Sequence, residues 1–299
     1  MGKALKKREL PLHIMLVPAV LITLVYSYGP MFGLIIAFEK LNVAKGIFRS
    51  DFVGLENFIY VLKLNGIFQI IFNTFLISLL KISGMIIVPV FVSILLNEVA
   101  NIFFKRFFQT LVYIPYFISW VVISGMLMDL LSPSNGMLNN FLKIFGIQPI
   151  FFLGDNFWFR ITIVITDLWK NFGFGTVIFL AALTNIDNTL YEASNIDGAN
   201  RWKQTIYVTL PGIRPIVILM TVLSLGNILN AGFEQIFTLY SPVVYQSGDI
   251  IDTFVYRLGL IDSQYGPATA VGIFKSVVST IFIVVSYKLA DVWAGYKII

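Results

Sequence analysis

The chain has 299 residues, of which 58% are hydrophobic and only 12% are charged, and its mean hydropathy is +0.84. This composition excludes an ordinary soluble globular domain and predicts a protein of the lipid bilayer. The formal net charge is only +5, and we expect the bilayer, and no nucleic acid, as a partner. The chain lacks cysteine, so disulfides and cysteine-based metal sites are excluded. Its single histidine, His13, is expected to pack or to lie at an interface rather than to bind a metal, since there is no second imidazole to complete a site.

The N-terminus carries four basic residues within positions 3–8, followed by a long apolar stretch. A signal peptide would have this pattern. The apolar stretch, however, continues to about Phe38 without a cleavage site of the Ala-x-Ala kind, and equally apolar segments follow. The pattern therefore predicts an uncleaved first transmembrane helix with its basic end in the cytoplasm.

Six apolar stretches are long enough to cross the hydrocarbon core of a bilayer, which needs about 20 helical residues. They cover residues 12–38, 67–96, 107–131, 158–184, 215–238 and 267–291. We therefore expect an all-α integral membrane protein in which residues 1–299 form a single transmembrane domain. Because the number of spans is even, both termini should lie on the same side of the membrane.

The distribution of basic residues indicates which side that is. On the side of the termini there are eleven, namely Lys3, Lys6, Lys7, Arg8, Lys105, Arg106, Arg201, Lys203, Arg214, Lys288 and Lys297. On the opposite side there are six, namely Lys40, Lys45, Arg49, Lys63, Lys143 and Arg257. This excess favours cytoplasmic termini, because loops rich in lysine and arginine tend to remain inside. We expect a multi-pass protein of a bacterial plasma membrane.

The predicted cytoplasmic loop of about residues 185–214 differs in composition from the rest of the chain. It predicts a short helix that begins at Asp187, Asn188 or Thr189 and ends at Gly198, in a left-handed capping conformation. A second short helix should end before Pro211. The apolar residues on this helical scaffold are Leu190, Tyr191, Ile196, Trp202 and Ile206. They indicate a surface that docks against a partner rather than a simple connection.

The string Glu-Ala-Ser-Asn-Ile-Asp-Gly-Ala at residues 192–199, followed by Thr-Leu-Pro at 209–211, resembles the "EAA" loop of permease subunits of binding-protein-dependent ABC importers. Nearly all of the chain resembles sugar-importer permeases of the maltose-type superfamily, especially the subgroup for complex oligosaccharides and polysaccharides. The strings that carry this resemblance are Gly-Leu-Glu-Asn-Phe at 54–58, Asn-Thr at 73–74, Leu-Asn-Glu at 96–98, Gln-Thr at 109–110, Ile-Pro at 114–115, and Trp-Lys at 169–170 with Gly173.

This resemblance implies a type I importer permease architecture and a set of partners. The loop would dock in a groove of a cytoplasmic pair of ATPases, whose closure on ATP switches the permease from inward-facing to outward-facing. A second, related permease subunit, an external solute-binding protein and a sugar substrate are also implied. The chain contains no Gly-x-x-x-x-Gly-Lys-Ser/Thr motif, so we expect no enzyme activity and no cofactor here, with ATP and magnesium bound by the partner ATPase.

The residues to which the resemblance assigns coupling are Glu192, Ala193, Ser194, Ile196, Asp197, Gly198, Ala199, Trp202, Leu210 and Pro211. Ser194 replaces the usual alanine, a change between small residues. Thr205 and Ile206 stand where the family often has aromatic residues. Glu192 has two possible roles, since it could accept backbone hydrogen bonds that brace the turn or pair with a basic residue of the ATPase.

Polar residues of the fifth predicted span suggest a path for the substrate. Asn227, Asn230 and Glu234 recur at spacings of three and four and would share one helix face. That face could either form hydrogen bonds to another helix along a small-residue seam or line the sugar path. Aromatic residues that could stack on sugar rings, or simply pack, are Tyr113, Tyr116, Trp120 and Trp169.

Charged residues inside the other spans are expected to serve the structure. Lys81, Lys170 and Lys275 should reach an interface or pair with a carbonyl or carboxylate, whereas Arg160 and Asp167 look like interfacial anchors. A secondary transporter or channel would instead require an inverted repeat with paired midplane charges, which the sequence does not indicate. A membrane-embedded enzyme or metal site would require a cluster of ligating residues, and none is apparent.

Overall fold

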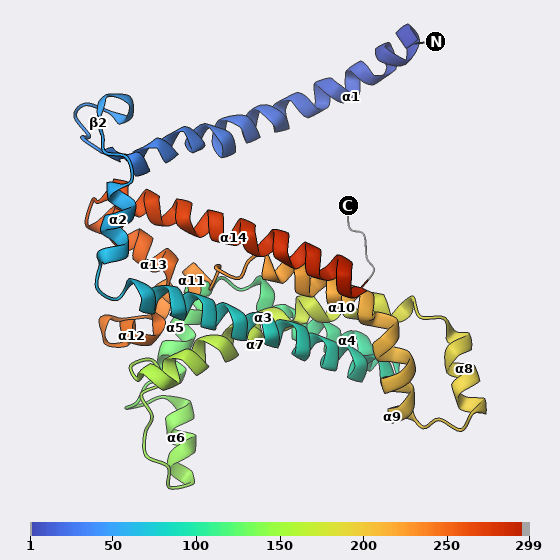
Figure 1. The fold of residues 1–299 in the computed structure, drawn as a ribbon. Helices are drawn as coiled ribbons and strands as arrows, with labels where there is room; N and C mark the ends of the chain where they lie inside the picture. Colours follow the sequence, from blue (N-terminus) through green and yellow to red (C-terminus); the bar gives the residue numbers. More distant parts are fainter. Residues whose placement is uncertain (1, 295–299) are drawn as a thin grey trace. The chain divides into compact units, whose positions relative to one another are not determined.

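The computed structural model describes residues 2–294, which divide into two compact units. The first unit comprises residues 2–65 and 255–274, and the second comprises residues 66–254 and 275–294. Almost all regular structure is helical (Figure 1). Within the described residues, five helices are long and apolar enough to cross a membrane, and a bent helix pair would make a sixth. The prediction of an all-α membrane protein is confirmed, and the six predicted spans are matched if the bent pair counts as one span.

The first unit begins with α1 (Gly2–Thr23), which continues through a π-helical turn (Leu24–Tyr28) and a 3-10 helix (Gly29–Phe38). It also contains a short antiparallel hairpin, β1 (Glu39–Lys40) and β2 (Asp51–Phe52), the helix α2 (Glu56–Lys63), a π turn (Arg257–Ile261) and the first turns of α14 (Tyr265–Ala294). The Asn57 amide donates to the carbonyl oxygens of Ala37 and Glu39 at 2.9 and 3.0 Å. This asparagine therefore ties α2 to the entry of the hairpin.

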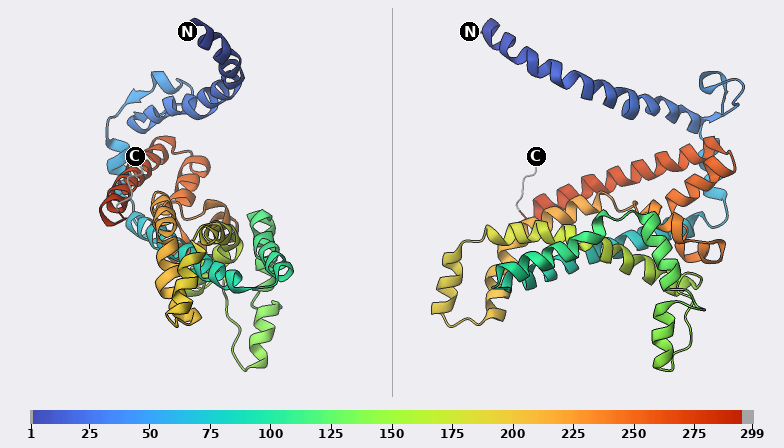
Figure 2. Two further views of the ribbon diagram at one scale, coloured as in Figure 1. Left: turned by 90° about the vertical axis from the view of Figure 1, so that its right-hand side faces the viewer. Right: turned by 180° about the vertical axis from the view of Figure 1, so that it is seen from behind.

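The second unit is built on α3 (Ile67–Glu98) and α7 (Asn156–Thr184), which pack against each other more extensively than any other pair. Its other helices are α4 (Ile102–Tyr113), α5 (Trp120–Leu130), α6 (Met137–Ile144), α8 (Asn188–Ile196), α9 (Arg201–Gln204), α10 (Leu210–Leu225), α11 (Phe233–Leu239), α12 (Tyr245–Gly248), most of α13 (Ile251–Tyr256) and the rest of α14. Within this unit, α8 and α9 lie at one end of the long helices and α6 and α12 at the other (Figures 1 and 2).

Close helix packing in this unit depends on small residues. Lipid tails are as apolar as leucine, so helices in a bilayer associate through tight packing and hydrogen bonds rather than through the hydrophobic effect. A Cβ added at Gly173 of α7 would lie 2.1 Å from the carbonyl oxygen of Val112, and one at Gly175 would lie 2.9 Å from Pro89. Both glycines therefore allow α7 to approach a neighbour more closely than alanine could. Between α3, α7 and α11, the side chains of Ile77, Phe159, Ile163 and Ile236 are fully buried.

The third predicted span, residues 107–131, is broken rather than continuous. Here α4 ends at Tyr113, a 3-10 turn (Ile114–Phe117) follows, and α5 leaves at a bend of 98°. Pro115 cannot donate a backbone hydrogen bond, and the Ser119 hydroxyl accepts the N–H of Val122 at 3.4 Å and so caps a new helix. The expectation of a single helix was wrong because the apolar pattern runs through the break.

The fifth predicted span, residues 215–238, was placed too far along the chain. The helix instead runs from Arg201 to Leu225, through a π turn (Thr205–Thr209) and past Pro211, so the second loop helix does not end before this proline. The extra backbone width of a π turn accommodates the proline ring. The chain leaves the helix at residues 226–232, and α11 starts after Gly232, whose φ is +93°. Asn227 and Asn230 therefore do not share a helix face with Glu234.

Candidate functional site

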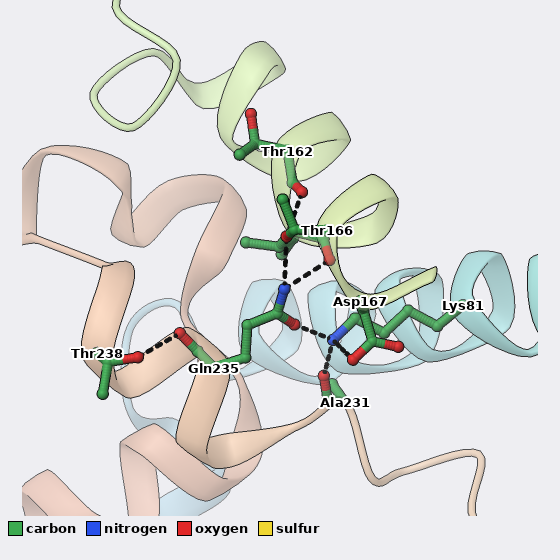
Figure 3. A network of polar contacts seen from close by, with 8 residues as sticks. Lys81, Thr162, Thr166, Asp167, Ala231, Gln235 and Thr238 are labelled. Atoms are coloured by element: carbon green, nitrogen blue, oxygen red, sulfur yellow. Dashed lines mark hydrogen bonds and ion pairs between the residues drawn. The ribbon is translucent and has the colours of Figure 1, made fainter. Parts of the chain in front are cut away.

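A buried lysine, Lys81 of α3, lies at the centre of a polar network (Figure 3). Its ammonium forms an ion pair with Asp167 of α7 at 3.3 Å and donates to the carbonyl oxygen of Ala231 at 2.8 Å. It also donates to the side-chain oxygen of Gln235 of α11. These three acceptors match the three N–H donors of a lysine ammonium. Lys81 therefore joins three separate elements of the second unit.

Gln235 extends this network back to α7. Its side chain is fully buried, and its amide nitrogen donates to the carbonyl oxygen of Ile163 at 2.8 Å and to the Thr166 hydroxyl at 2.9 Å (Figure 3). A charge at the centre of a transmembrane helix costs about 2.5 to 3.5 kcal/mol on insertion scales, so complete pairing of this kind is needed. The expectation that Asp167 is an interfacial anchor was wrong, because only 14% of its side chain is exposed and it pairs with Lys81.

A second buried lysine, Lys170 of α7, lies one helical turn after Asp167. Its ammonium donates to the carbonyl oxygen of Tyr116 at 2.8 Å, inside the break between α4 and α5. It also stands 5.5 Å from the Tyr116 ring and 5.7 Å from the Trp120 ring, within range of a cation–π attraction. Lys275 pairs with Asp252 of α13. Of the two outcomes expected for these lysines, the structure shows pairing with a carbonyl or a carboxylate.

A cavity of about 240 Å³ opens beside the Lys81 network. Its lining comprises Ser78, Lys81, Ile82, Met85, Asp167, Ser224, Asn227, Asn230, Ala231 and Gly232. The side chains of Asn227 and Asn230 are both exposed, because the chain between α10 and α11 is not helical at these positions. Two of the predicted path residues therefore lie together at one polar cavity.

The predicted aromatic residues occupy the other break. Tyr113 and Tyr116 stack on each other with ring centroids 5.7 Å apart, and Tyr116 also stacks on Phe174 at 5.1 Å. Glu234 is exposed at the start of α11. Trp169 is separate, since it is 46% exposed and makes no ring contact within the part of the chain that the structure describes.

At the far end of the unit, α8 ends in the turn expected from the glycine. The N–H of Ala199 donates to the carbonyl of Ser194 at 2.9 Å, and the N–H of Gly198 donates to that of Asn195 at 3.0 Å. These are the two bonds of a Schellman motif, and Gly198 has the positive φ, +73°, that the motif requires. The prediction of a left-handed Gly198 is confirmed.

The start of α8 is also capped as expected. The Asp187 carboxylate accepts the backbone N–H of Thr189 at 2.9 Å, which holds the pKa of Asp187 below its ordinary value. A lowered pKa means that the cap contributes at neutral pH and is lost only in acid, as the pH falls through the folded-state pKa.

Polar contacts that the sequence did not predict hold α8 against the following helix. Gln204 is 4% exposed, and its amide donates to the Ser194 hydroxyl at 3.1 Å and to the side-chain oxygen of Asn195 at 2.6 Å. The hydroxyls of Tyr191 and Thr209 lie 2.9 Å apart. Ser194 is thus more than a small residue, since an alanine at this position could not accept from Gln204. No local pattern marks Gln204 as buried, because its partners lie across the turn.

The outer surface of this α8–α9 hairpin is apolar and uncovered. Ile196 is 87% exposed, Trp202 71% and Leu190 52%. Glu192 is also exposed and accepts no hydrogen bond from the described residues, so the bracing role is not seen. Behind this surface, Arg201 pairs with Glu98 at the end of α3 at 3.5 Å. This pair links the hairpin to the long helices that carry the Lys81 network.

Residues 85–292 match the model of a protein family described as "binding-protein-dependent transport system inner membrane component". The chain belongs to this family. The matched region contains both helix breaks, Asp167 and Lys170, and the whole α8–α9 hairpin. Family members are membrane components of transporters, so this chain is a multi-pass inner-membrane permease.

Two relatives within this family are similar over most of their length. YteP of Bacillus subtilis (strain 168), a polygalacturonan/rhamnogalacturonan transport system permease protein, is 37% identical over 279 residues, which cover 93% of this chain and 87% of YteP. Protein LplB of the same strain is 36% identical over 277 residues, covering 93% of this chain and 87% of LplB.

Solved structures of permeases agree with the fold. A crystal structure of a bacterial ABC transporter involved in the import of the acidic polysaccharide alginate contains a chain that superposes with a TM-score of 0.89 and 35% identity, over 96% of this chain and 97% of that chain. A bacterial alginate ABC transporter in complex with an alginate pentasaccharide-bound periplasmic protein gives a TM-score of 0.87 and 35% identity, over 95% of both chains. The predicted type I permease architecture is confirmed.

Proposed function

We propose that this permease forms one wall of the path by which an ATP-driven importer brings in an oligosaccharide, delivered by an external solute-binding protein. The observation that carries the proposal is the cavity at the break of the fifth span, where the amides of Asn227 and Asn230 are exposed. An amide both donates and accepts hydrogen bonds, as sugar hydroxyls do. The polysaccharides named for YteP and for the alginate transporter support an oligosaccharide as the substrate.

A second, related permease subunit completes the path in this proposal. The cavity volume of about 240 Å³ is below the roughly 300 to 1,000 Å³ that is usual for a ligand pocket. A single chain would therefore enclose too little space for an oligosaccharide. The rings of Tyr113, Tyr116 and Trp120, at the neighbouring break, are the surfaces on which a sugar ring would stack. Of the four aromatic residues predicted for the sugar path, Trp169 has the least support.

Energy in this proposal comes from a pair of cytoplasmic ATPases that dock on the α8–α9 hairpin. A large apolar surface on an aqueous loop favours a protein partner, and Leu190, Ile196 and Trp202 provide one. Glu192 is then free to pair with a basic residue of the ATPase. ATP and magnesium bind to those partner subunits, since the sequence of this chain has no phosphate-binding loop.

The orientation is testable because the chain has no native cysteine. In the subunit expressed without its ATPases, which would otherwise cover this surface, Ile196→Cys on α8 should react with a membrane-impermeant maleimide only from the cytoplasmic face, in inverted vesicles. Ile144→Cys on α6, at the opposite end of the unit, should react only in intact cells, and both native side chains are well exposed at 87% and 78%. Labelling of both positions from the same side would contradict the orientation. Reporters fused at the two termini, of which Lys297 lies outside the described residues, should both indicate the cytoplasm.

Asn230→Leu tests the sugar path. Loss of an amide that bonds the sugar removes about 0.5 to 1.5 kcal/mol per hydrogen bond, so uptake should fall by up to about tenfold. The measurement is uptake by the assembled transporter of the sugar that mass spectrometry identifies on its binding protein. Asn140→Leu on α6 makes the same change away from the cavity and should leave uptake intact. Normal uptake by Asn230→Leu, or failure of this variant to assemble, would support a packing role instead.

A further inference from the structure

Each of the two helix breaks is attached to a continuous helix by a buried lysine. At the first break, Lys170 of α7 donates to the backbone carbonyl of Tyr116, and at the second, Lys81 of α3 donates to that of Ala231. An unbroken helix satisfies such carbonyls internally, whereas a break leaves them without partners in a region that contains no bulk water. The lysines supply these missing donors.

Lys81 has no donor left for a substrate. Its three N–H groups already face Asp167, Ala231 and Gln235, and it is 6% exposed. A direct role in binding sugar hydroxyls or a sugar carboxylate is therefore excluded for this ammonium in the conformation seen. An effect of Lys81 on transport would therefore act through the groups that it holds, and one of them, the Ala231 carbonyl, belongs to the 226–232 segment that carries Asn227 and Asn230.

Gly232 fits the same arrangement. Its φ of +93° is one that residues with side chains rarely adopt, and a Cβ there would lie 3.0 Å from the Lys81 ammonium nitrogen. The glycine thus both allows the turn into α11 and leaves room for the lysine. Two independent features of the chain, a buried charge and a positive φ, converge on the position of this segment.

Asp167 connects the two lysines. It pairs with Lys81 and lies three residues before Lys170 on α7, on the same helix face. Asp167 is mostly buried beside Lys81, so removal of Lys81 alone leaves an uncompensated carboxylate, whereas removal of both side chains leaves neither charge of the pair.

We propose that Lys81 and Lys170 are positioning residues of the transport path, which fix the 226–232 segment and the Tyr116 break to the α3–α7 pair through their bonds to the Ala231 and Tyr116 carbonyls. The proposal builds on the proposed sugar path. It predicts that the lysine is needed for the location of the segment itself, and not only to neutralise Asp167.

The test separates these two roles. In the assembled transporter, Lys81→Met should lower uptake by about tenfold or more, as expected for the loss of a charge-assisted hydrogen bond. Lys81→Met alone also leaves Asp167 buried without a partner, which should impair assembly of the transporter. Combining Lys81→Met with Asp167→Leu should restore assembly but not uptake. Full recovery of uptake in this double variant would mean that Lys81 only neutralises Asp167, and the proposal would be overturned.

The location of the segment is read out without any sugar. Asn230→Cys should react with a small methanethiosulfonate at a rate that changes in the Lys81→Met/Asp167→Leu background. The matched control is Lys275→Met with Asp252→Leu, which removes another, partly buried ion pair of the same unit. This control should leave the rate unchanged. An unchanged rate in the Lys81 background would overturn the proposal, whereas a changed rate together with normal uptake by Asn230→Leu would reject only the sugar path.

Gly232→Ala provides a second variant in case the charge variants fail to assemble. It leaves every charge in place but adds a Cβ at a positive φ, beside the Lys81 ammonium. The Asn230→Cys reaction rate should change and uptake should fall in this background too. A normal rate with normal uptake would show that the segment does not depend on its fit to Lys81.

Discussion

Gly198→Val should uncouple the transporter while the membrane-spanning helices remain folded. Gly198 has a φ of +73° in the Schellman turn of α8, and the space around it is open, so the penalty is backbone strain rather than a clash. Such strain costs about 1 to 3 kcal/mol and is greater for a β-branched residue. The Schellman turn should therefore change conformation, and the orientation of α8 relative to α9 should change with it. ATPase association, binding-protein-stimulated ATP hydrolysis and sugar uptake should all fall, uptake by roughly tenfold or more.

Two controls make this result specific. Gly198→Asn should retain most of the uptake, because asparagine tolerates the left-handed region better than other residues. Gly46→Val imposes the same kind of strain at another open glycine, with φ +79°, far along the chain from the hairpin, and should leave ATPase association unchanged. Wild-type coupling in Gly198→Val would show that the loop is a tolerant linker.

Gly173→Ala should displace the break between α4 and α5. The added Cβ would lie 2.1 Å from the carbonyl oxygen of Val112 and 3.0 Å from the Cα of Tyr113, and backbone atoms cannot rotate away as a side chain can. Overpacking of this kind costs about 1 to 3 kcal/mol. The shift would also stretch the bond from Lys170 to the Tyr116 carbonyl, so uptake should fall together with thermal stability.

The measurement is the midpoint of thermal unfolding of the purified complex, followed by uptake. Gly125→Ala, at an open position of the helical α5, is the matched control and should be neutral or stabilising by about 0.5 to 1 kcal/mol. Gly84→Ala is an intermediate case, since its Cβ would meet only the flexible Leu168 side chain, at 2.5 Å. Equal midpoints for the alanine variants at positions 173 and 125 would contradict the close approach of α7 to α4.

The continuous spans could be predicted from apolar length alone. The expected ranges 67–96, 158–184 and 267–291 correspond to α3 (Ile67–Glu98), α7 (Asn156–Thr184) and α14 (Tyr265–Ala294). The breaks could not be predicted in this way, because the residues around Pro115 and in the 226–232 segment lie inside apolar stretches that are long enough to be counted as single spans. Whether a proline kinks a helix or breaks it depends on what its neighbours supply to the freed backbone groups.

In the candidate site, too, features with a local sequence signal could be predicted, and features that depend on distant residues could not. Gly198 was predictable because a glycine after a short capped helix is a local signal. The partners of Lys81 were not, since Asp167 and Gln235 lie 86 and 154 residues away in the sequence. A lysine within an apolar span indicates that it has acceptors, but the sequence does not indicate which residues they are. The burial of Gln204 could not be predicted either, because it results from contacts across the turn with Ser194 and Asn195.

The central claim, that this chain is the sugar permease of an ATP-driven importer, is tested most directly in proteoliposomes that contain this subunit, its partner permease and its ATPases. We expect uptake of the binding protein's sugar only when ATP is present on the side of the α8–α9 hairpin and the loaded binding protein is on the other side. Uptake should be insensitive to dissipation of ion gradients. Sugar uptake by this chain without the ATPases, driven by an ion gradient, would contradict the account.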